Sequence, residues 1–132
     1  MKVVLDTNVI VAAFATRGLC AEIFEVCLLD RIIVLSDFIL SEVEEKLISK
    51  IHLPQGIVHE IIDYLRGQSE IVNPKEVKGS VCRDKADLNI IGTALSGNAR
   101  FIITGDEDLL ILKKYKGVEM ITPREFWSLL KG

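Results

Sequence analysis

The sequence has few residues that bind soft metals or form covalent cross-links. Among 132 residues there are three cysteines and two histidines. The odd cysteine count, with no Cys-x-x-Cys pair, argues against a disulfide framework and against structural zinc. Cys20 and Cys27 lie seven residues apart, so we expect them to share a helix face as small core residues. We expect His52 and His59 at the surface rather than at a metal.

Long apolar runs and strongly basic segments are also missing. No apolar run approaches the roughly 20 residues of a membrane span. The opening MKVVLD does not resemble a signal peptide, because its apolar run is short and an acid follows at once. The formal net charge is −3, so overall electrostatics do not indicate a nucleic-acid partner. We expect a cytoplasmic protein without membrane association, in a compartment that keeps thiols reduced.

What the chain does have is enough apolar sequence for one packed core. Apolar residues make up 49% of it, with charged residues interspersed and no repeat or low-complexity tract. This length fits one domain, which we expect to span residues 1–132.

Short apolar runs alternate with longer segments of helical periodicity. The strand candidates are residues 3–5, 32–35, 101–104 and 118–121, with a weaker one at 70–72. The helix candidates are residues 21–29, 37–51, 54–65, 84–96, 106–115 and 123–130. The strands are apolar throughout, as in a parallel sheet covered on both faces. The sequence therefore predicts an α/β fold, a three-layer α/β/α sandwich with a central parallel sheet.

Two aspartates directly follow strand candidates. Asp6 comes after residues 3–5, and Asp106 follows residues 101–104 after one glycine. Both should lie at the carboxyl edge of the sheet, where such folds bind ligands. Each residue alone is explained about equally well as a helix cap. Together they favour a functional site, because like charges gathered on one rim cost stability unless something uses them.

Two further positions carry acids of interest. Asp84 is well explained as a helix N-cap. Asp87 shares a helix face with Ile91 and Ala94, and a carboxylate on an inward face needs a partner or a metal. Glu42 is less clear, because spacing alone favours a solvated acidic face for its glutamate-rich helix.

Four segments, in order, resemble the motifs of PIN-domain nucleases. They are VVLDTNV at 3–9, the stretch 36–47 that contains Glu42, DLNIIGTA at 87–94 and TGDEDLL at 104–110. The closing ITPREF at 121–126 is typical of a bacterial and archaeal branch similar to VapC, described as toxins of toxin–antitoxin pairs. That branch often has RDPDD at the third motif, where this chain has RDKAD and keeps Asp87.

The resemblance implies a PIN-like fold and an Mg²⁺- or Mn²⁺-dependent endoribonuclease that hydrolyses phosphodiester bonds in single-stranded RNA. Asp6, Asp87 and Asp106 would bind one or two ions, and Glu42 would orient the attacking water. Supporting side chains would hold these carboxylates in place, and the candidates are Thr7, Asn8, Asp84, Thr104 and Asp108. The implied partners are the RNA substrate and an antitoxin protein. The RNA-binding residues stay open; the cations nearest the acids in sequence are Arg83, Lys85, Lys113 and Lys114.

Other functions stay open at this point. The chain could be a non-catalytic PIN-like module that binds RNA or protein, or a housekeeping RNA-processing nuclease. A phosphatase of the haloacid dehalogenase type fits poorly, because it needs acids where this chain has Asn8 and Leu110.

The sequence also predicts a two-fold homodimer. Helix candidates 37–51 and 54–65 carry more apolar positions than one sheet face needs, and surplus apolar patches usually mark interfaces. These positions include Ile48, Ile57, Val58, Ile61 and Ile62.

Overall fold

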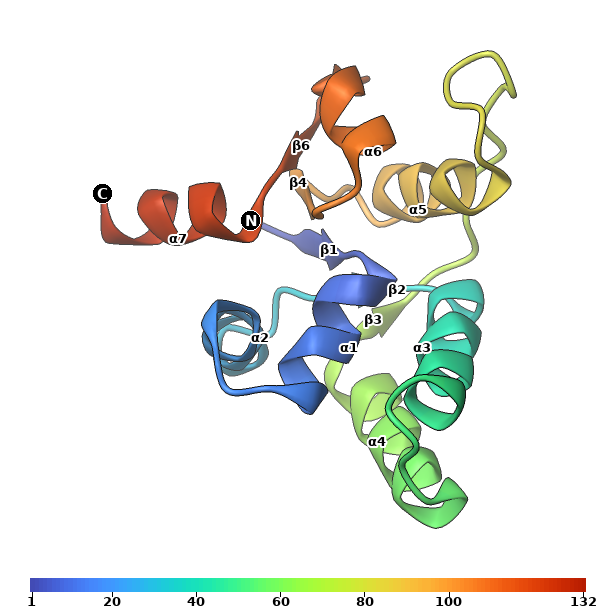
Figure 1. The fold of residues 1–132 in the computed structure, drawn as a ribbon. Helices are drawn as coiled ribbons and strands as arrows, with labels where there is room; N and C mark the ends of the chain where they lie inside the picture. Colours follow the sequence, from blue (N-terminus) through green and yellow to red (C-terminus); the bar gives the residue numbers. More distant parts are fainter.

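The computed structural model describes all residues 1–132, and strand and helix alternate along the chain (Figure 1). The strands are β1 (Val3–Leu5), β2 (Val34–Leu35), β3 (Glu70–Ile71), β4 (Phe101–Ile103), β5 (Lys114–Tyr115) and β6 (Val118–Ile121). The helices are α1 (Thr7–Ala15), α2 (Leu19–Leu29), α3 (Asp37–Ser49), α4 (Gln55–Gln68), α5 (Lys85–Ser96), α6 (Glu107–Leu112) and α7 (Pro123–Lys131). No helix has the length and apolar character needed to span a membrane.

The sheet is mainly parallel, and β1 lies near its middle. β1 pairs with β4, and β4 pairs with β6, both in parallel. On the other side, a parallel bridge between Val3 and Ile33 connects β1 to the parallel pair β2–β3. Only β5 is antiparallel, at the outer edge beside β6. The predicted α/β class with a central parallel sheet is confirmed.

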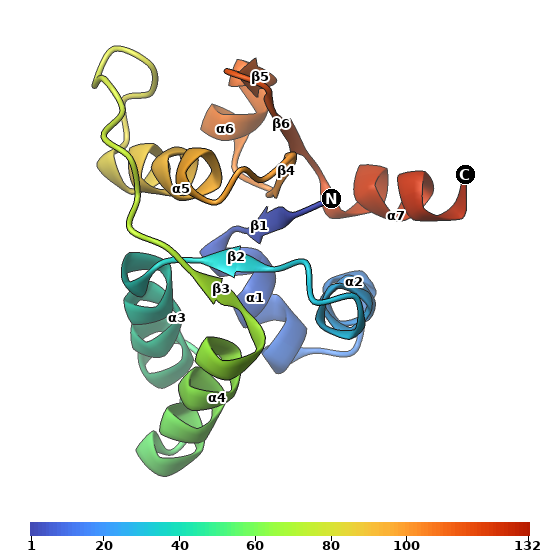
Figure 2. The same ribbon diagram turned by 180° about the vertical axis from the view of Figure 1, so that it is seen from behind.

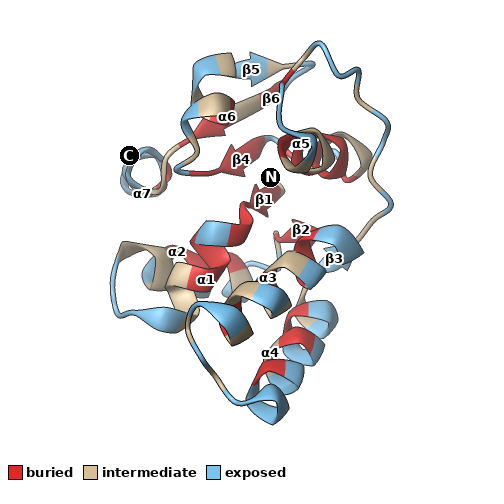
Figure 3. Ribbon diagram, turned by 45° about the vertical axis from the view of Figure 1, so that its right-hand side comes forward, coloured by how far each residue is buried: buried red, intermediate tan, exposed pale blue.

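Helices form a layer on each side of this sheet. Helices α1 to α4 lie on one side and α5 and α6 on the other, in both views (Figures 1 and 2). Every side chain of β1 and β4 is buried, as strands covered on both faces require (Figure 3). The capping box of Thr122 and Glu125 starts α7, whose Phe126 packs edge-on against Phe101 with ring centroids 6.1 Å apart.

One helix was not predicted from the sequence, and one helix was predicted too long. No helix was predicted at α1, because its apolar residues do not form a stripe; Val9, Ile10 and Val11 are consecutive and all buried. The predicted helix 106–115 ends earlier, at Leu112, because Lys113 has a φ of 63°. The chain then forms the β5–β6 hairpin. Its two turn residues, Lys116 and Gly117, both have positive φ, which suits a tight two-residue connection.

Gly92 allows the chain to cross α5 closely. The amide of Lys75 donates to the carbonyl of Gly92 at 3.0 Å, and a Cβ on Gly92 would collide with the Lys75 carbonyl. Close backbone approach of this kind requires glycine. Because α5 also carries Asp87, this crossing helps to position the acidic residues described next.

Candidate metal-binding active site

The carboxyl ends of β1 and β4 place two aspartates at one edge of the sheet. Leu5 and Ile103 are partners in the parallel register, so the residues that follow them emerge side by side. These include Asp6 after β1 and Asp106 at the start of α6. The N-terminal turn of α5 adds Asp87, which is 3% exposed, and it lies on the inward face with Ile91 and Ala94 as predicted.

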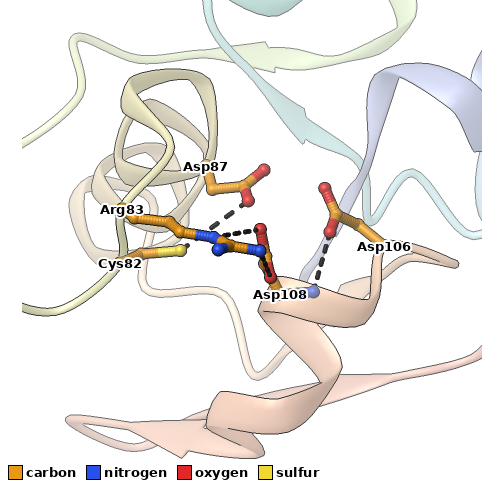
Figure 4. A network of polar contacts seen from close by, with 5 residues as sticks. All are labelled: Cys82, Arg83, Asp87, Asp106 and Asp108. Atoms are coloured by element: carbon orange, nitrogen blue, oxygen red, sulfur yellow. Dashed lines mark hydrogen bonds and ion pairs between the residues drawn. The ribbon is translucent and has the colours of Figure 1, made fainter.

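Asp87, Asp106 and Asp108 form the tightest acidic cluster. Each offers one carboxylate oxygen, and these oxygens all lie within 4.8 Å of one another. The carboxylates of Asp87 and Asp106 face each other across a small gap (Figure 4). Asp106 also accepts the Asp108 amide at 2.9 Å, which orients it at the start of α6. Three hard oxygen donors in this arrangement fit a divalent ion such as Mg²⁺ or Mn²⁺.

The Thr104 hydroxyl links Asp6 to this cluster. Oγ1 of Thr104 donates to Oδ2 of Asp6 at 2.7 Å and accepts the amide of Asp106 at 2.9 Å. Both Thr104 and Asp6 are buried. Asp6 occupies the N-cap position of α1, but its side chain makes no capping hydrogen bond. The capping interpretation therefore fails for Asp6, whereas Asp106 does cap α6.

Helices α1 and α3 carry further polar side chains near Asp6, and the charge of Glu42 contributes to the raised pKa of Asp6. Thr7 donates to Oε1 of the half-buried Glu42 at 2.8 Å, and Lys46 donates to Oδ1 of Asn8 at 2.9 Å. Lys46 was not among the candidates from sequence. The available signal was its spacing, because residues four apart on a helix share a face and Lys46 follows Glu42 by four. Helix α3 therefore presents both a carboxylate and an ammonium group to α1.

The loop before α5 contributes three contacts. The Cys82 thiol donates to Oδ2 of Asp87 at 3.7 Å (Figure 4). The guanidinium of Arg83 donates to both oxygens of Asp108 at 3.3 and 3.2 Å. Asp84 is exposed and caps α5 by accepting the amide of Ala86 at 2.8 Å, so its capping interpretation is confirmed. Sequence reasoning did not identify Cys82 as a neighbour of the site.

Burial and neighbouring negative charges raise the pKa of two of these acids, Asp87 and Asp6. Burial, followed by the negative charges of Asp106 and Asp84, raises the pKa of Asp87 to about 7. Burial also raises the pKa of Asp6; the Thr104 hydrogen bond opposes this shift, and the charge of Asp106 adds to it. Proximity of uncompensated carboxylates is unfavourable, and a bound cation relieves it.

This electrostatic strain predicts how stability depends on pH. The folded pKa of Asp87, about 7, exceeds the ordinary value of 3.8, so the folded state binds its proton more tightly than the unfolded chain does. The protonated Asp87 carboxyl stabilises the folded state at low pH, and this contribution is lost as the pH rises from the ordinary pKa of 3.8 to the folded pKa of about 7. We expect the melting temperature of chelator-treated Asp87→Asn, minus that of the parent, to grow between about pH 5 and about pH 7.5. A constant difference would contradict this assignment.

A mainly parallel sheet with carboxylates converging at its carboxyl edge defines an α/β fold with a candidate metal site. The family model described as PIN domain matches residues 2–108, most of the chain. The chain therefore belongs to the PIN domain family, whose members are generally nucleases that use divalent metal ions. A search of curated proteins finds no significant match.

Proposed function

We propose that the protein is an Mg²⁺- or Mn²⁺-dependent endoribonuclease that hydrolyses phosphodiester bonds in single-stranded RNA. The observation that carries this proposal is the convergence of Asp87, Asp106 and Asp108 oxygens within 4.8 Å in a chain of the PIN domain family. Their donor chemistry favours hard divalent ions, and no cluster of histidine or cysteine competes for a softer metal.

Each acid has a role in this proposal. Asp87 and Asp106 bind the ion together with Asp108, and Asp6, held by Thr104, offers oxygens to the same or a second ion. A bound divalent ion supplies the charge that holds a phosphate and lowers the pKa of a water molecule. Glu42 orients the attacking water, and its hydrogen bond from Thr7 fixes the carboxylate for that task.

Two basic side chains near the acids support the proposal of an RNA substrate, although the net charge of the chain is negative. Lys46 of α3 donates to Asn8, two residues after Asp6, and Arg83 of the loop before α5 donates to Asp108, so two separate elements bring positive charge to the acids. Arg83 is 85% exposed and available to solvent-borne ligands. Contacts from lysine and arginine to phosphates supply most of the sequence-independent affinity for nucleic acids.

A cleavage assay tests the function. Single-stranded and duplex RNA of the same sequence would be incubated with the protein in Mn²⁺, Mg²⁺ or a chelator. We expect internal cuts in the single strand that require either metal and stop with chelator. RNA binding without cleavage in every metal condition would instead favour a non-catalytic binding module.

We also propose that the protein is the cytoplasmic toxin of a toxin–antitoxin pair. The closing ITPREF segment, which is typical of the toxin branch, supports this assignment. An adjacent reading frame for a small protein with a DNA-binding segment, whose co-expression suppresses the cleavage, would support it further. A gene without such a neighbour would point to RNA maturation or decay.

We further propose that residues 1–132 act as one domain that forms a two-fold homodimer. The structure accounts for part of the apolar surplus, because Val58 and Ile62 are buried. Ile57 and Tyr64 of α4 stay exposed at 45% and 49%, and they lie seven residues apart on one side of the helix. Light scattering at tens of micromolar should give twice the chain mass of 14.7 kDa. A monomer under these conditions would contradict the proposal.

A further inference from the structure

We propose that the hollow beside the acidic cluster binds one nucleobase of the RNA strand. This inference rests on the proposed nuclease function and adds a base-binding subsite to it. The hollow has a volume of about 300 Å³ and lies between the loop before α5 and the helix α6. It is one of three hollows on the molecule and the one that shares residues with the acidic cluster and its ion pair.

The hollow is continuous with the site through two residues. Arg83 and Asp108 line it, and Asp108 also belongs to the carboxylate cluster. Val81, Ile111 and Leu112 supply apolar walls. Asp108, Ile111 and Leu112 lie at positions i, i+3 and i+4 of α6, so they share one face of the helix. An RNA phosphate held at the cluster therefore brings an adjacent nucleotide to this apolar surface.

Val81 and Leu112 are partly buried against the core, but packing inside the protein does not explain the exposure of Ile111. Helix α6 buries Leu109 against the protein, whereas its Ile111 is 75% exposed. Arg83 is 85% exposed, and both of its contacts to Asp108 are made by guanidinium N–H groups. Such hydrogen bonds lie in the guanidinium plane, so they leave a flat face free to stack.

A flat cationic face beside apolar side chains is the chemistry that recognises an unpaired base. Proteins that bind single-stranded RNA stack its bases on aromatic side chains or on guanidinium planes. Stacking tolerates sequence differences, because every base has a π-face. The subsite should therefore require a base at one position near the cut with little preference for its identity. A base-paired duplex cannot supply that base, which favours single strands.

The test uses the full-length protein and single-stranded RNA whose cut position has been mapped with the parent enzyme. A stable abasic ribose analogue replaces one nucleotide at a time on either side of the cut. We expect one abasic position to lower kcat/KM by about fivefold to tenfold, the range for losing a modest stacking contact. Ile111→Ala should lower that penalty measurably, because it removes one apolar wall while the guanidinium face of Arg83 remains. Ile111→Phe should keep or enlarge it, because an aromatic ring stacks better than an aliphatic chain.

The matched control is Leu29→Ala on α2, where the wild-type side chain is 78% exposed and outside the hollow. It should keep the abasic penalty of the parent. The Mn²⁺ concentration for half-maximal activity should be the same in all Ile111 variants, because Ile111 binds no metal. The base-binding proposal is contradicted if no abasic position lowers kcat/KM. It is also contradicted if Ile111→Ala still cleaves RNA and keeps the full loss in kcat/KM. A parent that cuts no RNA would overturn the nuclease function itself, and the subsite with it.

Discussion

Asp87→Asn is expected to lower metal-dependent RNA cleavage by orders of magnitude. The substitution removes one charge from the Asp87–Asp106–Asp108 cluster and nearly preserves its shape. Positioning of the ion accounts for much of the reduction in the barrier, so losing one ligand affects kcat more than RNA binding. Initial rates in Mn²⁺ and Mg²⁺, with RNA affinity measured separately, check the prediction. The matched control is Glu107→Gln, which removes an exposed acid of the same helix start that lies outside the cluster.

Stability should change in the opposite direction. The Asp87 carboxylate is buried among like charges, so Asp87→Asn should melt at an equal or higher temperature than the parent without metal. Added Mn²⁺ should stabilise the parent by about 2.7 kcal/mol at a hundredfold excess over its dissociation constant, and the variant much less. A variant that cuts RNA as well as the parent and melts lower would show that Asp87 has only a structural role.

Thr104→Val is expected to weaken both metal binding and the fold. Its hydroxyl is buried, donates to Asp6 and accepts the amide of Asp106. Valine has nearly the same shape but leaves a buried carboxylate and an amide without that partner. Loss of a group that orients a metal ligand typically costs about 10- to 100-fold in metal affinity or activity. A newly unsatisfied buried group costs about 1–3 kcal/mol, and more when the group is charged.

Two variants separate this hydrogen bond from simple packing. Thr104→Ser keeps the hydroxyl and should retain most of the metal affinity, measured by Mn²⁺ titration. Combining Thr104→Val with Asp6→Asn removes the buried charge as well as its donor, so the double variant should unfold less easily than Thr104→Val alone. If Thr104→Ser, which keeps the hydroxyl, loses as much metal affinity as Thr104→Val, the hydrogen bond to Asp6 is not what supports metal binding.

The sequence alone was sufficient to predict the class of the fold. Continuous apolar runs such as Val3–Leu5 and Phe101–Ile103 indicate strands buried on both faces, and this property depends on local composition. The α1 helix and the β5–β6 hairpin were missed for local reasons as well. The first has no apolar stripe, and the second depends on the backbone conformation of Lys113, which its side chain does not favour.

From the sequence alone, the ends of the strand candidates also place Asp6 and Asp106 at one edge of the sheet. Parallel strands all run in one direction, so residues that directly follow them lie at the same edge of the sheet. The inward stripe of α5 gave Asp87 in the same way, because helical periodicity is local. By contrast, spacing did not select Glu42, whose orientation depends on a hydrogen bond from Thr7, 35 residues away in the chain.

What only the tertiary structure decided is which side chains meet across these elements. It moved Asp108 from a supporting position into the tightest carboxylate cluster and paired it with Arg83. It placed Lys46 beside Asn8, and it left Ile111 exposed next to the site. Periodicity and strand ends are determined by neighbouring residues, and the sequence displays them directly. Contacts between residues 25 to 98 positions apart depend on how helices pack on the sheet, which local patterns do not encode.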